Sequence, residues 1–178
     1  FSRLDRLFLK LYSTEEDLSL RVVLDTSASM DFGEPTKFDY GRKRAAALAY
    51  VGLNNLDRVS LIACADGQVS AMRGLKSRRQ MPGVLNFLAA LECAGTTTLD
   101  AGLVDQLDTR SRGRAGRGLV VLISDVLVHD GLTSILTALR ALGHEVVVVH
   151  LLAEEEIDPP LDGAYRLVDA ESGASVRI

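Results

Sequence analysis

The stretch RVVLDTSASM, from Arg21 to Met30, decides the fold. Val22 to Leu24 is a short apolar run of the kind found in the centre of a parallel sheet, where both faces are covered. Asp25, Ser27 and Ser29 follow at the point where the strand must end, because serine and aspartate favour turns over a continued strand. The stretch therefore predicts a buried strand that runs into a loop rich in side-chain oxygens.

The oxygens of this loop indicate a cation site. In open α/β sheets ligands bind beyond the carboxyl ends of the strands, and the D-x-S-x-S pattern places three oxygen-bearing side chains there. A set of oxygens without histidine or cysteine favours a hard cation such as Mg²⁺. From this stretch alone, the alternative that these residues only turn and cap the chain stays open.

The composition fits one domain with a well-filled core. The chain has 178 residues, of which 47% are hydrophobic. Its net charge of −4 offers no overall attraction to nucleic acid or to an anionic bilayer. No apolar run approaches the ~20 residues of a membrane-spanning helix. Because the first residue is Phe1 and not methionine, we expect a processed or excised piece of a longer protein.

The two cysteines, Cys64 and Cys93, bear on the compartment. They are far apart in the sequence and have neither a C-x-x-C nor a Cys/His spacing. This pattern predicts buried free thiols in a reducing compartment rather than a zinc site or a disulfide. We therefore expect a cytoplasmic location.

Apolar runs alternate with amphipathic segments along the rest of the chain. Apolar positions three and four apart predict a helix from Lys37 to about Leu56, with Thr36 and Asp39 as a capping box. Asp66-Gly67 is a turn signal between an apolar strand and a more polar edge strand. The other expected elements are the strands Asp57–Ala65, Gln68–Arg73, Leu119–Ser124 and Glu145–Leu152, helices opened by Pro82 and by Gly131, a helix carrying Leu99, Leu103 and Leu107, an acidic connection from Glu154 to Asp158, and a hairpin from Tyr165 to Ile178 that turns at Ser172-Gly173.

This alternation predicts an α/β fold: a doubly wound, mostly parallel sheet with helices on both faces and one antiparallel edge strand. We expect residues 18–178 to form this domain and residues 1–17 to be an N-terminal strand or a remnant of a preceding region. Asp125 follows its strand as Asp25 follows the first. The two acids come together if their strands are neighbours in the sheet.

Two further stretches lie on predicted loops. Ala94–Gly102 has three consecutive threonines before a helix, and at least one of them is expected to cap that helix. Arg110–Gly118 is basic and rich in glycine, and a solvated loop is favoured there over an anion-binding site. Its glycines do not have the order of a dinucleotide-binding fingerprint.

Together these residues resemble the von Willebrand factor type A (vWA) domain, whose metal-ion-dependent adhesion site combines D-x-S-x-S, a threonine and a distant aspartate. Asp25, Ser27 and Ser29 match the first motif, and Asp125 after LVVLIS matches the distant acid. Among the threonines, the resemblance selects Thr97. More narrowly, VVLDTSASMDFGEPTKFDYGRKRAAALAY and YRLVDAESG resemble a bacterial group known as domain of unknown function fifty-eight, whose members are often encoded beside a MoxR-type AAA+ ATPase.

The resemblance implies a non-enzymatic adaptor domain that binds proteins through a cation. The residues implied to hold Mg²⁺, or Mn²⁺ or Ca²⁺, are Asp25, Ser27, Ser29, Thr97 and Asp125. The hydroxyls bind the ion directly and the aspartates mostly through water, so that the Asp or Glu of a partner protein completes the coordination. The implied partner is a MoxR-type AAA+ ATPase, and no nucleic acid is expected.

Two other interpretations stay open. A haloacid-dehalogenase-like phosphatase would use Asp25 as its nucleophile together with Mg²⁺. Such enzymes need a second acid two residues on, where this chain has Ser27, and a downstream lysine for which no candidate stands out. A metal-free relic would use the same residues structurally. No histidine or lysine is predictably placed as a base for catalysis.

Overall fold

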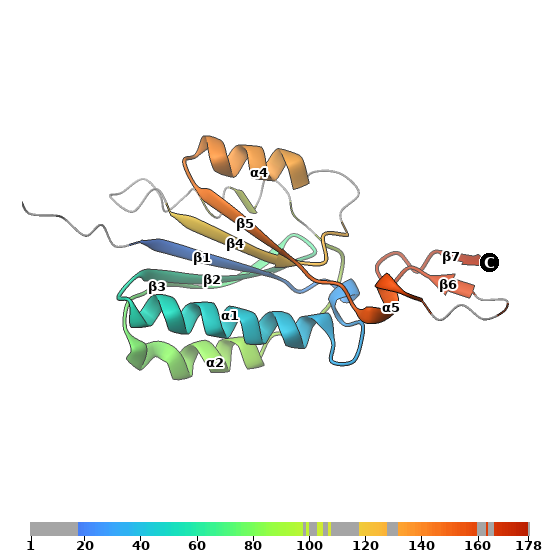
Figure 1. The fold of residues 1–178 in the computed structure, drawn as a ribbon, viewed down its shortest axis with the longest axis horizontal. Coiled ribbons are helices and arrows are strands. Elements are labelled where there is room, and N and C mark those ends of the chain that lie inside the picture. Colours follow the sequence, from blue (N-terminus) through green and yellow to red (C-terminus); the bar gives the residue numbers. More distant parts are fainter. Residues whose placement is uncertain are drawn as a thin grey trace, which may run out of the picture.

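The computed structural model describes residues 18–97, 99, 103–104, 107, 118–127, 132–159, 163 and 166–177. In this part of the chain a five-stranded sheet carries helices on both faces, and a two-stranded hairpin follows it (Figure 1). The predictions for residues 1–17 and for the basic loop up to residue 117 lie outside the described residues. No helix in the described ranges is both long and apolar enough to cross a membrane.

The sheet has the predicted arrangement. Its order is β3-β2-β1-β4-β5, in which only the β2–β3 pair is antiparallel. Because β4 is hydrogen-bonded to β1, the ends of these two strands lie side by side. The strands are β1 (Ser19–Asp25), β2 (Arg58–Ala65), β3 (Gln68–Leu75), β4 (Leu119–Ser124) and β5 (Glu145–His150), and the hairpin strands are β6 (Arg166–Val168) and β7 (Ser175–Arg177). The predicted doubly wound sheet with one antiparallel edge strand is confirmed.

The helices cover the two faces of the sheet. In Figure 1, α1 and α2 lie against one face and α4 lies against the other. Side chains of β1 alternate between the two cores, with Val22 and Leu24 on the α1 side and Val23 on the opposite side, beside Leu103. The helices are α1 (Lys37–Asn54), α2 (Met81–Ala89), α4 (Leu132–Ala141) and α5 (Glu154–Ile157), with short 3-10 helices η1 (Ala28–Met30) and η2 (Arg78–Gln80).

Helix α1 begins and packs as its sequence predicts. The Thr36 hydroxyl accepts a hydrogen bond of 3.1 Å from the backbone N–H of Asp39, which caps the helix. The buried face of α1 consists largely of small residues, which let the helix lie close to the sheet. A Cβ at Gly52 would stand 2.7 Å from Cγ2 of Val59 and 3.1 Å from Cδ2 of Leu20.

Replacing Gly52 by valine is expected to lower the free energy of unfolding by about 2 kcal/mol, because the added methyl groups overfill the space between α1 and β2. Urea unfolding measures the difference. The matched control is Val51→Ala on the exposed side of the same helix, which is expected to stay within about 0.5 kcal/mol of the wild type. Equal stabilities for wild type and Gly52→Val would contradict the close packing of this helix.

The segment predicted as an acidic connection contains a helical turn, α5, instead. The Glu156 carboxylate accepts a hydrogen bond of 2.8 Å from the backbone N–H of Ala153 and so satisfies one of the free amides at the start of the turn. Glu154, Glu155 and Glu156 all lie in this first turn, where negative charge is favourable because of the helix dipole. The run of acids that suggested only a connection therefore stabilises this helical turn.

Candidate metal centre

The loop after β1 turns its oxygens inward. Asp25 and Ser27 are fully buried, and Ser29 is buried. One oxygen of the Asp25 carboxylate accepts a hydrogen bond of 3.0 Å from the backbone N–H of Ser27, and the other accepts one of 2.6 Å from the hydroxyl of Ser124. The hydroxyl oxygens of Ser27 and Ser29 lie 3.0 Å apart. Buried polar groups are expensive unless they have partners, so this loop is fixed in one arrangement.

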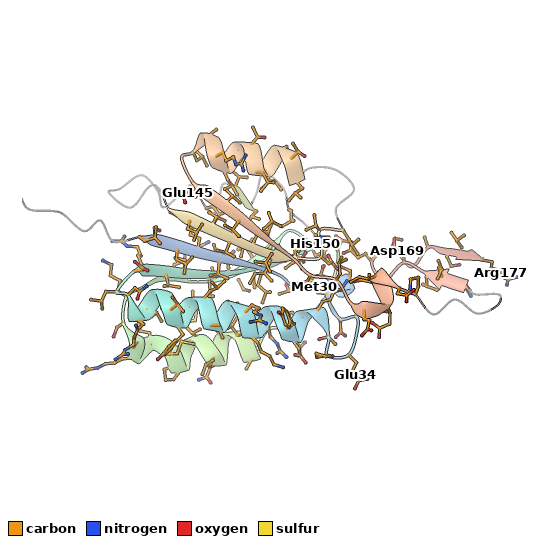
Figure 2. The ribbon with its side chains drawn as sticks, viewed as in Figure 1. Met30, Glu34, Glu145, His150, Asp169 and Arg177 are labelled. Carbon is orange, nitrogen blue, oxygen red and sulfur yellow. The ribbon has the colours of Figure 1, made fainter. Side chains whose placement is uncertain are left out.

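Asp125 follows β4 and lies at the same end of the sheet as the loop after β1. It is 1% exposed. Its carboxylate accepts hydrogen bonds from Nζ of Lys37, at 2.8 Å, and from the backbone N–H of Leu127, at 3.3 Å. Its backbone oxygen lies 3.0 Å from Nε2 of His150. Figure 2 shows His150 and Met30 together at this end of the sheet, with Glu145 at the opposite end.

The backbone after Asp125 is strained. Val126 has a φ of +59°, a left-handed conformation that a β-branched residue rarely adopts. The conformation is held by a hydrogen bond of 2.9 Å from the Val126 N–H to the hydroxyl of Ser124, the same hydroxyl that donates to Asp25. Ser124 thus connects both strand ends, and strain of this kind concentrates at functional sites.

Thr97 reaches the same region from a different loop. The loop is tied to the D-x-S-x-S segment by a hydrogen bond from Ala28 N–H to the oxygen of Gly95, at 2.9 Å, and by one from Ala94 N–H to the oxygen of Thr26, at 2.9 Å. Gly95 has a φ of +72°, and a Cβ at this position would stand 2.6 Å from Cβ of Asp66, so the loop requires glycine here. The structure therefore brings Asp25, Ser27, Ser29, Asp125 and Thr97 to one end of the sheet from three separate segments.

Lys37 is a member of the site that the sequence did not reveal. Its side chain is 2% exposed, and its ammonium group lies 2.8 Å from the Asp125 carboxylate and 2.5 Å from the Glu156 carboxylate. Lys37 is the first residue of α1, where the helix dipole disfavours a positive charge. The two carboxylates compensate for this. No lysine stood out as a candidate from sequence, and a lysine at a first helical position was the available signal.

Burial governs the ionisation of the site. It raises the pKa of Asp25, and the nearby Asp125 raises it further, while hydrogen bonds from Ser124 and Ser27 act in the opposite direction. Burial, followed by the charges of Asp31 and Asp25, raises the pKa of Cys93 to about 12. Cys93 therefore stays a neutral thiol near pH 7 and offers no thiolate to a metal. Both cysteines are free, Cys64 being buried and Cys93 half-buried.

An open cavity of about 540 Å³ reaches one of the proposed metal residues, Ser29. Ser29 lies in its wall beside the acids Glu156 and Glu171. The apolar part of the wall includes Phe32 and Leu127, which are 46% and 52% exposed. A ligand that enters this cavity meets both apolar surface and the serine hydroxyl.

The oxygens present fit a hard cation. Adjacent ligands around an octahedral Mg²⁺ stand about 3.0 Å apart when the bonds are about 2.1 Å long. The hydroxyls of Ser27 and Ser29 are hydrogen-bonded to each other at 3.0 Å, and this distance also matches the separation of adjacent ligands. In the described part of the chain, no three or more His, Cys, Asp or Glu side chains are grouped to hold a metal ion, so any cation here depends on the hydroxyls.

The sequence has relatives in mycobacteria. A protein of Mycobacterium tuberculosis, described as uncharacterized, is 28% identical over 163 residues, which are 89% of this chain and 50% of that protein. The chain thus spans about half the length of the curated relatives it matches.

Solved structures share the fold at low sequence identity. An aerotolerance-related membrane protein of Bacteroides fragilis is similar with a TM-score of 0.56 and 16% identity, over 90% of this chain and 81% of that one. The vWA domain of SpRpn10 has a TM-score of 0.51 and 11% identity, over 76% of each chain. The manganese-loaded TRAP protein of Plasmodium vivax has a TM-score of 0.53 and 16% identity, over 80% of this chain and 61% of that one.

These similarities place the chain in a vWA-like fold, and a family model assigns the family. The model described as "Protein of unknown function DUF58" matches residues 2–178, which is nearly the whole chain. The chain therefore belongs to the DUF58 family and carries its vWA-like domain.

Proposed function

We propose that the domain is a protein-binding adaptor in which a divalent cation, held at the ends of β1 and β4, accepts an acidic side chain from a partner. One observation carries this proposal. Buried oxygens that follow β1 and β4, and the half-buried Thr97 of a third segment, lie at one end of the sheet, with the hydroxyls of Ser27 and Ser29 at the separation of neighbouring metal ligands. The manganese in the TRAP protein, which has a similar fold, supports the choice of cation.

The neutral and the charged residues of the site would bind the cation in different ways. Ser27, Ser29 and Thr97 would hold the ion through neutral hydroxyls, and Asp25 and Asp125 would act through water. A cation held in this way keeps most of its positive charge and attracts a carboxylate. Lys37 contributes by pairing with Asp125, which keeps that carboxylate from neutralising the ion completely.

The wall of the cavity points to the kind of partner segment. Phe32 and Leu127 expose apolar surface beside Ser29. A partner Asp or Glu flanked by an apolar side chain would satisfy both parts of the wall at once. A cytoplasmic MoxR-type AAA+ ATPase is our proposed partner, on the resemblance to the bacterial group described above.

One observation supports the phosphatase alternative and another contradicts it. Lys37 supplies a buried lysine beside an acid, which the sequence had not revealed. However, Asp25 is fully buried and both of its carboxylate oxygens accept hydrogen bonds, so it is not presented to a phosphate ester as a nucleophile. The second acid that such enzymes need is still replaced by Ser27. We therefore infer a binding domain rather than an enzyme.

Titration calorimetry with Mn²⁺ tests the proposal. The wild type is expected to bind one Mn²⁺ per chain, and Ser29→Ala is expected to bind it about tenfold more weakly, because a direct hydroxyl ligand is lost. Ser70→Ala, at an exposed serine on β3, is the matched control and should leave the affinity unchanged. A wild type that takes up no Mn²⁺, or that hydrolyses a phosphomonoester in Mg²⁺, would overturn the proposal.

The binding function itself is tested with the ATPase. Co-precipitation of the domain with the purified MoxR-type ATPase is compared in Mg²⁺ and in EDTA. The proposal expects capture in Mg²⁺ and its loss in EDTA or with Ser29→Ala, whereas capture that ignores both changes would place the interface elsewhere.

A further inference from the structure

The turn of the C-terminal hairpin places an acid on the cation site. Oε1 of Glu171 accepts a hydrogen bond of 2.7 Å from the Thr97 hydroxyl and another of 3.1 Å from the Thr97 backbone N–H. Glu171 also lines the same cavity as Ser29. A carboxylate from the chain itself thus contacts one of the proposed ligands and faces another.

The turn is built to hold this acid in place. The Asp169 carboxylate accepts hydrogen bonds from the backbone N–H groups of Glu171, at 2.9 Å, and Ser172, at 3.4 Å. Gly173, with a φ of +70°, donates a hydrogen bond of 2.9 Å from its N–H to the backbone carbonyl oxygen of Asp169. These bonds fix the backbone around Glu171, and the two hydrogen bonds from Thr97 hold its carboxylate, so little conformational freedom is left to lose.

The rest of the hairpin is loosely attached. Every residue of β6 and β7 is exposed, and within the described residues these strands pair with each other and not with the five-stranded sheet. In Figure 2, Asp169 lies on the side of the hairpin near the sheet, and Arg177 lies farther out. The hairpin therefore brings its turn to the site while burying little of its own surface, an arrangement that can be displaced without unfolding the domain.

We propose that Glu171 is an intramolecular ligand of the cation site, which occupies the position that the carboxylate of a partner requires. This inference rests on the proposed function above. A tethered carboxylate acts at an effective concentration in the millimolar range or higher, so a free acidic side chain alone does not replace it. A partner replaces it by adding contacts, for which the exposed Phe32 and Leu127 are available.

Replacing Glu171 by glutamine tests the inference, since glutamine keeps an oxygen that can accept the hydrogen bonds from Thr97 but is a weak ligand for Mn²⁺. Water-proton relaxation measures how many water molecules are bound to Mn²⁺ in the protein. Glu171→Gln is expected to show one more bound water than the wild type and about tenfold weaker Mn²⁺ binding. Added acetate should displace that water in the variant and leave the wild type unchanged.

The matched control is Glu155→Gln, which removes an exposed acid that does not line this cavity. It should behave as the wild type. If the wild type and Glu171→Gln bind Mn²⁺ with equal water number and equal affinity, the inference is wrong while the cation site stands. If the wild type binds no Mn²⁺, the proposed function fails and the inference fails with it. Amide hydrogen exchange of residues 166–177 in the absence of metal shows whether the hairpin keeps its place in the variant.

Discussion

Replacing Asp25 by asparagine is expected to weaken Mn²⁺ binding by about 100-fold, the upper range for a group that acts on a metal through an intermediate ligand. Asparagine has nearly the same size as aspartate, keeps an oxygen for the N–H of Ser27, and has an NH₂ group that can donate to the hydroxyl oxygen of Ser124, so the loop should keep its shape. What is lost is the negative charge that orients and neutralises the bound ion. Titration calorimetry at neutral pH measures the change in affinity.

The same variant tests the electrostatics of the metal-free protein. Because burial raises the pKa of Asp25, the folded state favours the protonated carboxyl. This contribution to stability is fully present below the ordinary pKa of about 3.9 and is lost as the pH rises through the raised value. The asparagine side chain of the variant does not titrate. In EDTA, the difference in unfolding free energy between variant and wild type is therefore expected to shift in favour of the variant as the pH rises from about 3.5 to 7.

Two results would contradict this. If Asp25→Asn binds Mn²⁺ with unchanged affinity, Asp25 does not take part in cation binding. If the difference in unfolding free energy between Asp25→Asn and the wild type is independent of pH, the charge of Asp25 is not unfavourable in the folded protein. Glu92→Gln, at an exposed position after α2, is the control for the loss of one negative charge.

Replacing Lys37 by methionine is expected to lower the free energy of unfolding by about 3 kcal/mol in EDTA. The side chains of Lys37 and Asp125 are 2% and 0% exposed, so the substitution leaves a buried carboxylate without its cation. Saturating Mg²⁺ or Mn²⁺ should recover part of the loss, because an ion bound to the folded state stabilises it and supplies positive charge near Asp125. Urea unfolding with and without the metal measures both effects.

The double variant Lys37→Met with Asp125→Asn decides the cause of that loss. If the unpaired charge is responsible, the second substitution should restore much of the stability, as a double-mutant cycle would report. If the double variant is as unstable as the sum of the single ones, the loss comes from packing of the lysine stem instead. Lys43→Met, on the exposed side of α1, is expected to change the stability by no more than about 0.5 kcal/mol.

The sheet could be predicted from sequence because its signals are local. The strands β1, β2, β4 and β5 each contain an apolar run, the more polar β3 follows the Asp66-Gly67 turn signal, and the helices repeat their apolar residues at three and four. The sequence predicts that Asp25 and Asp125 come together only if their strands are neighbours, and the pairing of β1 with β4 in the structure meets that condition.

The contacts around the proposed site could not be predicted in the same way. Lys37 meets Asp125 and Glu156 across the fold, and in its own segment it is only a charged residue at the start of an amphipathic helix. Glu171 lies in a polar turn, where an acid is usually solvated. Such partners are set by how the hairpin and α5 return to the sheet, which no local periodicity records. The predicted metal-ligand roles of Asp25, Ser27, Ser29, Thr97 and Asp125 remain for the binding experiments to decide.

The direction in which the hairpin leaves the domain matters for any surface-based assay. Ser19 begins β1 at the end of the sheet away from the site, about 20 Å from Asp25 for a strand of this length, whereas β7 follows the turn that carries Glu171. Immobilisation through the N-terminal side would leave the site accessible to solution and the hairpin free to move. A C-terminal tag would constrain the hairpin itself. An affinity measured on a sensor coupled there would then depend on whether the attachment holds Glu171 at the site or away from it.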